Sequence, residues 1–159
     1  MDRSELLKFL RSHDLAVQSS VSARGEPQAA VVGFAITDEF EFVFDTVDTT
    51  RKIENLRKNP VIALTVGGLT DHDERTVQCT GIADEPAGPV LDRLKDVYFS
   101  VFPDGRDRQS WQGITYVRVR PIWMRFSDFN NDPPQIVEFD FGEGSQGGET
   151  GSKNPPPSS

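Results

Sequence analysis

The sequence predicts a mainly β protein: a small antiparallel barrel of six or seven strands, with two or three short helices. Runs of strand length, either alternating or continuously apolar, recur along the chain and are separated by Gly-, Pro- or Asp-containing turns. Several of these turns have hairpin length, which favours antiparallel pairing of sequence neighbours. A closed barrel leaves no strand edge of such a meander unpaired.

The first part of the chain predicts one helix and three strands. The expected ranges are a helix at 4–12 and strands at 15–21, 28–36 and 40–44. Apolar side chains recur at helical spacing in the first range, and Gly25 suits the turn between the first two strands because glycine tolerates positive φ. Phe40, Phe42 and Phe44 alternate, so they are expected on one face of the third strand.

The second part predicts two more helices and three or four more strands, with a short terminal strand besides. The expected ranges are a helix at 49–59, strands at 60–66 and 75–83, a helix at 89–101, one or two strands within 113–127 and a short strand at 136–139. Gly81 inside a strand pattern indicates a bulge or a close backbone approach. Residues 102–112 are polar and are expected to form a loop.

Composition defines one folded domain and a tail. Residues 1–141 are long enough to bury a substantial core. Residues 142–159 are rich in Gly, Ser and Pro and contain no large apolar side chain, so we expect this tail to be disordered.

Charge and cysteine usage exclude several classes of protein. The net charge of −8 argues against a broad nucleic-acid surface, and no apolar run is long enough for a membrane span. The polar start of the chain lacks the pattern of a secretory signal. The single cysteine, Cys79, rules out an internal disulfide and fits a reducing compartment, so we expect a cytoplasmic protein.

The segment FDTVDTTRK predicts a phosphate site. Thr49, Thr50, Arg51 and Lys52 stand where a helix begins. A helix N-terminus has unpaired N–H groups and a partial positive charge, which together attract anions. The alternative interpretation is an ordinary cap followed by solvated cations.

Two further groups of reactive side chains were weighed. Asp71, His72, Asp73 and Glu74 are ligand-type residues, but neighbours in a loop point in different directions, so we expect no metal site. Cys79 is expected to be a buried core residue. No sequence motif assigns a catalytic residue.

Four segments resemble the pyridoxamine 5′-phosphate oxidase-like superfamily of FMN-binding split barrels. They are LAVQSSVSARGEPQAAVVGF, FVFDTVDTTRKIENLRKNPVIALTV, RTVQCTGIA and YVRVRPIWMRFSDF. The resemblance implies a six- to seven-stranded antiparallel split barrel, bound FMN and a homodimer with each flavin at the subunit interface.

The resemblance also implies roles for particular residues. Arg51 and Lys52 would contact the FMN phosphate, and Phe44 and Asp45 would lie beside the ribityl chain. The backbone and side chains of residues 30–33, with Val31, Val32 and Gly33, would line the ring. Thr76 takes the place of a glutamine that faces the ring in the oxidases, Gln78 could substitute for it, and Trp123 is expected near the flavin.

Two departures argue against pyridoxamine phosphate oxidase activity itself. QAAVVGF lacks the Arg and Lys of authentic oxidases, and Arg125-Phe126-Ser127-Asp128 replaces their Arg-x-His-x-Arg segment. The expected function is therefore a flavin-dependent oxidoreductase acting on another small molecule. The alternatives are a flavin carrier or sensor without turnover, a reductase that uses a deazaflavin, and a heme-binding relative, for which neither His13 nor His72 is convincingly placed.

Overall fold

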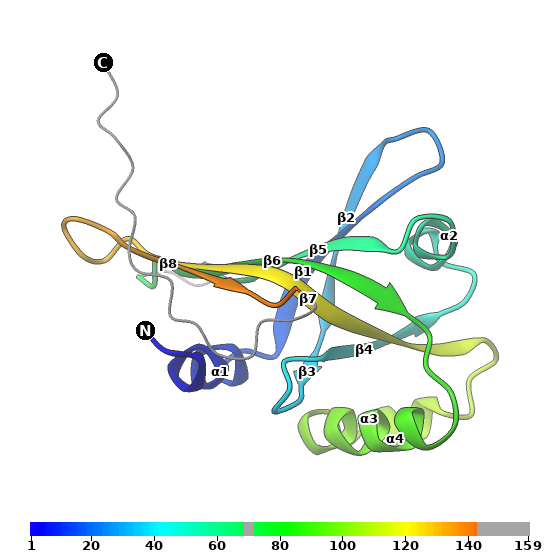
Figure 1. The fold of residues 1–159 in the computed structure, drawn as a ribbon. Coiled ribbons are helices and arrows are strands. Elements are labelled where there is room, and N and C mark those ends of the chain that lie inside the picture. Colours follow the sequence, from blue (N-terminus) through cyan, green and yellow to red (C-terminus); the bar gives the residue numbers. More distant parts are fainter. Residues whose placement is uncertain (69–71, 143–159) are drawn as a thin grey trace.

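The computed structural model describes residues 1–68 and 72–142, which form one curled antiparallel sheet with four helices (Figure 1). The elements are α1 (Arg3–Arg11), β1 (Leu15–Val21), β2 (Pro27–Gly33), β3 (Ala35–Ile36), β4 (Phe42–Val47), α2 (Arg51–Lys58), β5 (Val61–Gly67), β6 (Arg75–Asp84), α3 (Gly88–Val101), α4 (Gly105–Arg108), β7 (Ile114–Asp128) and β8 (Gln135–Asp140). The expected disorder concerns residues 142–159, of which 143–159 lie outside the described residues.

The order of the strands explains why the sheet curls. The strands pair in the order β2-β1-β5-β6-β7-β4-β3, and β8 pairs with β7. Strands β2 and β3 stand at opposite ends of this order, yet Phe34 alone separates them in the chain. The two ends must therefore approach each other, which produces the split barrel and confirms the predicted mainly β class.

The predicted meander of the first three strands is wrong beyond the first hairpin. The expected strand 28–36 is broken at Phe34, whose N–H donates to the carbonyl of Asp14 at 2.9 Å. After this break the chain crosses to the far end of the sheet, where β4 pairs with β7 instead of β2. The described residues contain eight strands instead of six or seven, because the break at Phe34 divides one expected strand into β2 and β3.

Gly81 marks a bulge, as predicted. The register between β6 and β7 shifts between Thr80 and Gly81, opposite Pro121. A Cβ at Gly81 would come within 2.7 Å of the Arg120 carbonyl oxygen, so only glycine fits here without a shift of the backbone. The bulge also accommodates a proline that cannot donate to the ladder, and β7 continues through it as one strand.

Strand β4 separates two apolar clusters. Phe42 and Phe44 point into the barrel, while Val43 packs against Leu94 and Tyr98 of α3 on the opposite side. The expectation that Phe40, Phe42 and Phe44 share one face is confirmed, since all three lie in the barrel cluster. Because α3 covers the other side, both faces of β4 are buried over residues 42–44.

Cys79 is a core residue, with 2% of its surface exposed, and burial raises the pKa of its thiol to about 12. We expect no labelling by a thiol reagent at pH 8 in the native protein and complete labelling in urea. Because the folded pKa lies above the unfolded value of about 9, stability should fall by about 1 kcal/mol between pH 9 and pH 10. A Cys79→Ala variant should lack this part of the pH dependence of the unfolding free energy, and equal slopes in both proteins would contradict the assignment.

Candidate anion pocket at the start of helix α2

Helix α2 lies beside the β1–β2 hairpin (Figure 1). Thr50 is the N-cap in an extended conformation, but its side chain makes no capping hydrogen bond. The N–H groups of the first turn are therefore left without the usual side-chain acceptor, among the residues that the structure describes. Together with the helix dipole, they favour an anion at this end.

The four cations of α2 fall into two pairs. Arg57 is bound to Glu85 at 2.8 Å, and Lys58 to Glu54 at 3.0 Å. Arg51 and Lys52 have no carboxylate within 4.0 Å in the part of the chain that the structure describes. The Lys52 ammonium donates instead to the Thr46 hydroxyl at 3.4 Å, and Thr46 lies 3.3 Å from the hydroxyl of Thr50. The charges at the start of the helix are thus available, whereas those at its end are neutralised.

A cavity of about 350 Å³ opens beside these two cations. Its lining residues are Gln18, Ser20, Gln28, Ala29, Ala30, Arg51 and Lys52. A second hollow of about 250 Å³ shares Gln28 and Arg51 with it and extends toward the β1–β2 turn. The small side chains of Ala29 and Ala30 leave room for a ligand against strand β2.

The wall of this cavity contains a buried polar network. Gln18 and Ser20 are on the face of β1 that points inward, with 2% and 0% of their surfaces exposed. Asn55 of α2 donates to the Ser20 hydroxyl at 3.1 Å and to the Gln28 side-chain oxygen at 3.0 Å. Gln18, Ser20, Gln28 and Asn55 were not predicted as site residues, although polar residues on both faces of β1 were a visible signal in the sequence.

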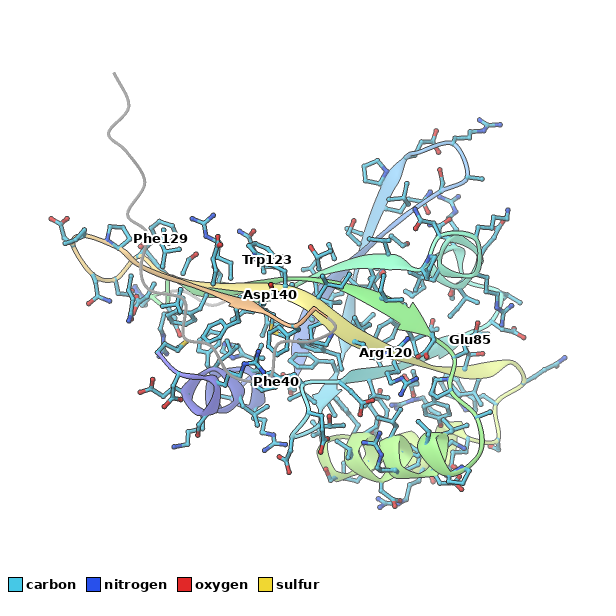
Figure 2. The ribbon with its side chains drawn as sticks, in the orientation of Figure 1. Phe40, Glu85, Arg120, Trp123, Phe129 and Asp140 are labelled. Atoms are coloured by element: carbon cyan, nitrogen blue, oxygen red, sulfur yellow. The ribbon has the colours of Figure 1, made fainter. Side chains whose placement is uncertain are left out.

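The structure divides the predicted site residues into separate groups. Arg51 and Lys52 line the cavity, with Thr50 beside them and Thr49 in the exposed turn before it. Phe44 and Val32 are buried in the barrel core. The outer face of the sheet carries the others: Val31, Thr76, Gln78 and Trp123, the last visible in Figure 2 on the side away from α1 and α3.

Asp45 points to the opposite side of β4 from the cavity. Its carboxylate accepts a hydrogen bond from the Tyr98 hydroxyl at 3.0 Å and pairs with Arg108 at 2.8 Å. Burial, and then the charge of Asp45, raises the pKa of Tyr98 above its usual value. This arrangement attaches α4, which the sequence analysis expected to be a loop, to the barrel.

Gly33 lies at the end of β2 under the same segment. A Cβ at Gly33 would come within 2.8 Å of the Phe102 ring, so the glycine allows Phe102 to pack closely on β2. Residues 102–112 line neither of the two hollows at α2.

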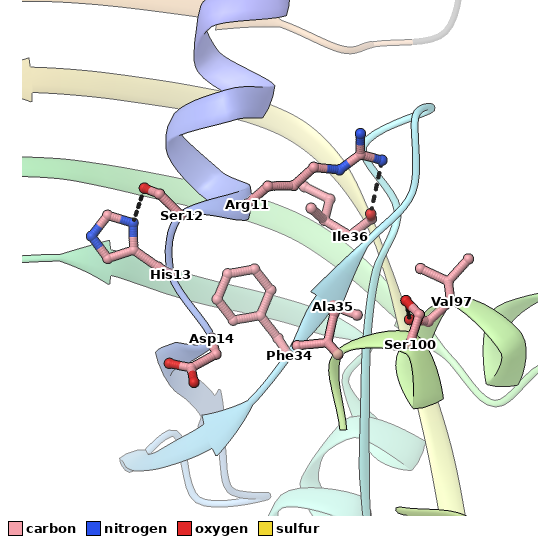
Figure 3. A pocket seen from close by; sticks show the side chains of 10 residues that line it. Arg11, Ser12, His13, Asp14, Phe34, Ala35, Ile36, Val97 and Ser100 are labelled. Carbon is pink, nitrogen blue, oxygen red and sulfur yellow. Dashed lines mark hydrogen bonds between the residues drawn. The ribbon is translucent and has the colours of Figure 1, made fainter. Parts of the chain in front are cut away.

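A larger cleft of about 730 Å³ lies between the end of α1, β3 and α3 (Figure 3). The guanidinium of Arg11 lines this cleft but already has partners. It pairs with the Asp38 carboxylate at 2.7 Å and donates to the Ile36 carbonyl oxygen at 3.3 Å. The His13 Nδ1 lies 2.9 Å from the Phe9 carbonyl oxygen and 3.1 Å from the Ser12 hydroxyl. This cleft therefore offers less free charge than the pocket at α2.

The acidic loop before β6 is used for ion pairing. Asp71 lies outside the described residues, and Asp73 binds Arg75 at 2.8 Å. The hydrogen bonds from Arg75 lower the pKa of Asp73 to about 2.

The fold and the pocket define a split-barrel protein with a cavity lined by two cations. A family model described as pyridoxamine 5′-phosphate oxidase matches residues 3–126. The chain therefore belongs to the pyridoxamine 5′-phosphate oxidase family, as the sequence motifs predicted. No curated protein matches the sequence.

Solved structures of similar fold include proteins with different described ligands. A heme-binding protein from Mycobacterium smegmatis is 12% identical, with a TM-score of 0.76, and covers 88% of this chain; this chain spans 58% of that protein. The heme storage protein HutZ from Vibrio cholerae is 15% identical, with a TM-score of 0.65 and coverage of 75% and 89% of the two chains. A pyridoxamine 5′-phosphate oxidase-related, FMN-binding protein from Nostoc punctiforme is 11% identical, with a TM-score of 0.68 and coverage of 89% and 91%. At these identities the likeness establishes the fold alone.

None of the described helices is long and apolar enough to cross a bilayer.

Proposed function

We propose that this protein binds FMN in the pocket at the start of α2 and is a flavin-dependent oxidoreductase acting on a small molecule other than pyridoxamine phosphate. The observation that carries the proposal is the pair Arg51 and Lys52, which have no carboxylate partner among the described residues and flank an uncapped helix N-terminus beside a cavity. A phosphate there would receive charge-assisted hydrogen bonds from both side chains and from the N–H groups of the first turn.

The other residues of the cavity fit a cofactor that carries out the chemistry itself. Flavins supply hydride and single-electron transfer, while the protein binds, orients and tunes the ring. Amides, hydroxyls and alanines make up the lining apart from the two cations, and no carboxylate or imidazole is among them. These residues can hold and orient a flavin, and they supply no obvious general acid or base.

A homodimer with the flavin at the subunit interface is part of the proposal. Leu15, Val31 and Val61 point to the outer face of the sheet and are 46%, 60% and 45% exposed. Exposed apolar side chains on one face are typical of a protein interface. The same outer face, away from the pocket at α2, carries Thr76, Gln78 and Trp123. In the proposed homodimer, these residues of one subunit would lie near the flavin bound by the other subunit.

A flavin carrier or sensor without turnover is the second candidate. It is favoured by the position of residues 102–112, which line neither hollow at α2 and so do not close a substrate cavity there. A deazaflavin fits the same cationic pocket. Heme is a further candidate ligand, because two structural neighbours are described as heme proteins and His13 lies in the wall of the 730 Å³ cleft.

The identity of the ligand tests these proposals. Protein purified without added cofactor should be yellow, with absorption near 450 nm, and mass spectrometry of the released ligand should find the mass of FMN. A deazaflavin mass would redirect the proposal to the deazaflavin reductases, and a Soret band would redirect it to heme. A colourless protein that takes up no added FMN would overturn the proposed function.

A further inference from the structure

Gln18 is the one residue in the pocket wall whose polar side chain is both buried and unpaired. Only 2% of its surface is exposed, and its side-chain oxygen is fully covered with no hydrogen-bond partner among the described residues. The residue lies on the inner face of β1, paired with Ala30 of β2 and Leu64 of β5, and it lines the 350 Å³ cavity.

The polar side chains next to Gln18, unlike Gln18 itself, are hydrogen-bonded to one another. Ser20 accepts a hydrogen bond from Asn55, which also donates to Gln28, so that part of the wall is satisfied within the chain. A buried amide without a partner destabilises a fold, and an apolar residue of similar size would be better tolerated at this position. The structure therefore retains, beside an open cavity, a hydrogen-bonding group that the described chain does not use.

We propose that Gln18 is a ligand-recognition residue, which binds a hydroxyl or N–H group of a phosphate ester whose phosphate is held by Arg51 and Lys52. This inference rests on the proposed function of the pocket and adds a second contact point to it. The carboxamide carries an oxygen and an NH₂ group, and rotation about its last bond presents either one to the cavity, so it can pair with a polyol chain or with a heterocyclic amide.

The position of Gln18 determines what it can recognise. The cations line the cavity from the start of α2, and Gln18 lines it from β1, so a ligand must extend from the phosphate into the cavity to touch both. Inorganic phosphate alone would bind the cations without reaching Gln18. The carboxamide therefore distinguishes phosphate esters that carry a hydrogen-bonding group from those that do not.

Replacement by methionine tests this inference, since methionine is close to glutamine in size but has no hydrogen-bonding amide. The Gln18→Met protein should bind FMN at least tenfold more weakly than wild type, whereas competition of inorganic phosphate for the pocket should be unchanged. The melting temperature of the ligand-free variant should be no lower than that of wild type, because an unpaired buried amide has been removed. Gln112→Met, the same change at an exposed position, is the matched control and should leave all three measurements unchanged.

The outcomes separate this inference from the proposed function. Equal FMN dissociation constants for wild type and Gln18→Met would overturn the role of Gln18. The proposed pocket would stand if the double replacement of Arg51 and Lys52 by alanine still weakens FMN binding. A lower melting temperature with unchanged affinity would show a purely structural role. Wild-type protein that binds neither FMN nor phosphate would overturn both proposals. If Gln18→Met does not fold, Gln18→Leu serves for the same comparison.

Discussion

Replacing Arg51 and Lys52 together by alanine is expected to weaken FMN binding by about 2–5 kcal/mol, which is about 30- to 4,000-fold in Kd. Each side chain would lose a charge-assisted hydrogen bond to phosphate, and the remaining N–H groups of the helix would hold the anion alone. The stability of the ligand-free protein should change by less than about 0.5 kcal/mol, because neither cation has an ion-pair partner among the described residues. Flavin fluorescence quenching measures the affinity, and urea unfolding measures the stability.

The same helix provides the matched control. Arg57→Ala with Lys58→Ala removes the same two charges, but these cations are neutralised by Glu85 and Glu54 at the other end of α2. The control should bind FMN within about threefold of wild type, since its effect is limited to long-range screened electrostatics. Equal weakening by both double variants would show that net charge, and not the pocket, controls binding.

Replacing Phe44 by alanine is expected to lower the unfolding free energy by about 3–5 kcal/mol. Phe44 has no exposed surface and lies in the main barrel cluster with Phe34 and Phe42, so its removal would leave a cavity that the surrounding strands cannot close. Chemical denaturation would show this loss directly. Phe129→Ala, at a position 52% exposed, is the control and should change stability by less than about 0.5 kcal/mol.

This experiment also decides between two roles for Phe44. The resemblance to flavin proteins placed it beside the ribityl chain, whereas its burial makes it a core residue. A Phe44→Leu variant keeps an apolar side chain in the core and should fold. Unchanged FMN affinity in that variant would support the core role, and an affinity loss comparable to that of the Arg51 and Lys52 double variant would restore Phe44 to the site.

Local pattern was sufficient for most of the individual elements. The apolar spacing in residues 4–12 and the run Leu15–Val21 predicted α1 and β1 to within a residue, because periodicity and turn residues act over a few positions. The same reasoning predicted the bulge at Gly81 and the buried state of Cys79. Prediction from local pattern failed at Phe34. The strand ends there and the chain changes direction, but no local sequence feature indicates the break.

The candidate site was predicted in part. Thr50, Arg51 and Lys52 could be found from the sequence because a cap, two cations and a helix start are adjacent in the chain. Gln18, Gln28 and Asn55 come from three different elements, and only folding brings them to the two hollows at the start of α2. Asp45 was assigned to the flavin from the resemblance, but α3 and α4 supply Tyr98 and Arg108 as its partners.

The sequence by itself determined the strand-rich class, the family and the cations at the start of α2, since each depends on residues close together in the chain. Tertiary structure alone decided which cations of α2 have carboxylate partners and which strand pairs with β4. It also decided that the side-chain oxygen of Gln18 is buried with no hydrogen-bond partner among the described residues. These properties depend on contacts between segments that are distant in the sequence, such as the ion pair of Arg57 with Glu85. Local sequence patterns do not specify which distant segments come into contact.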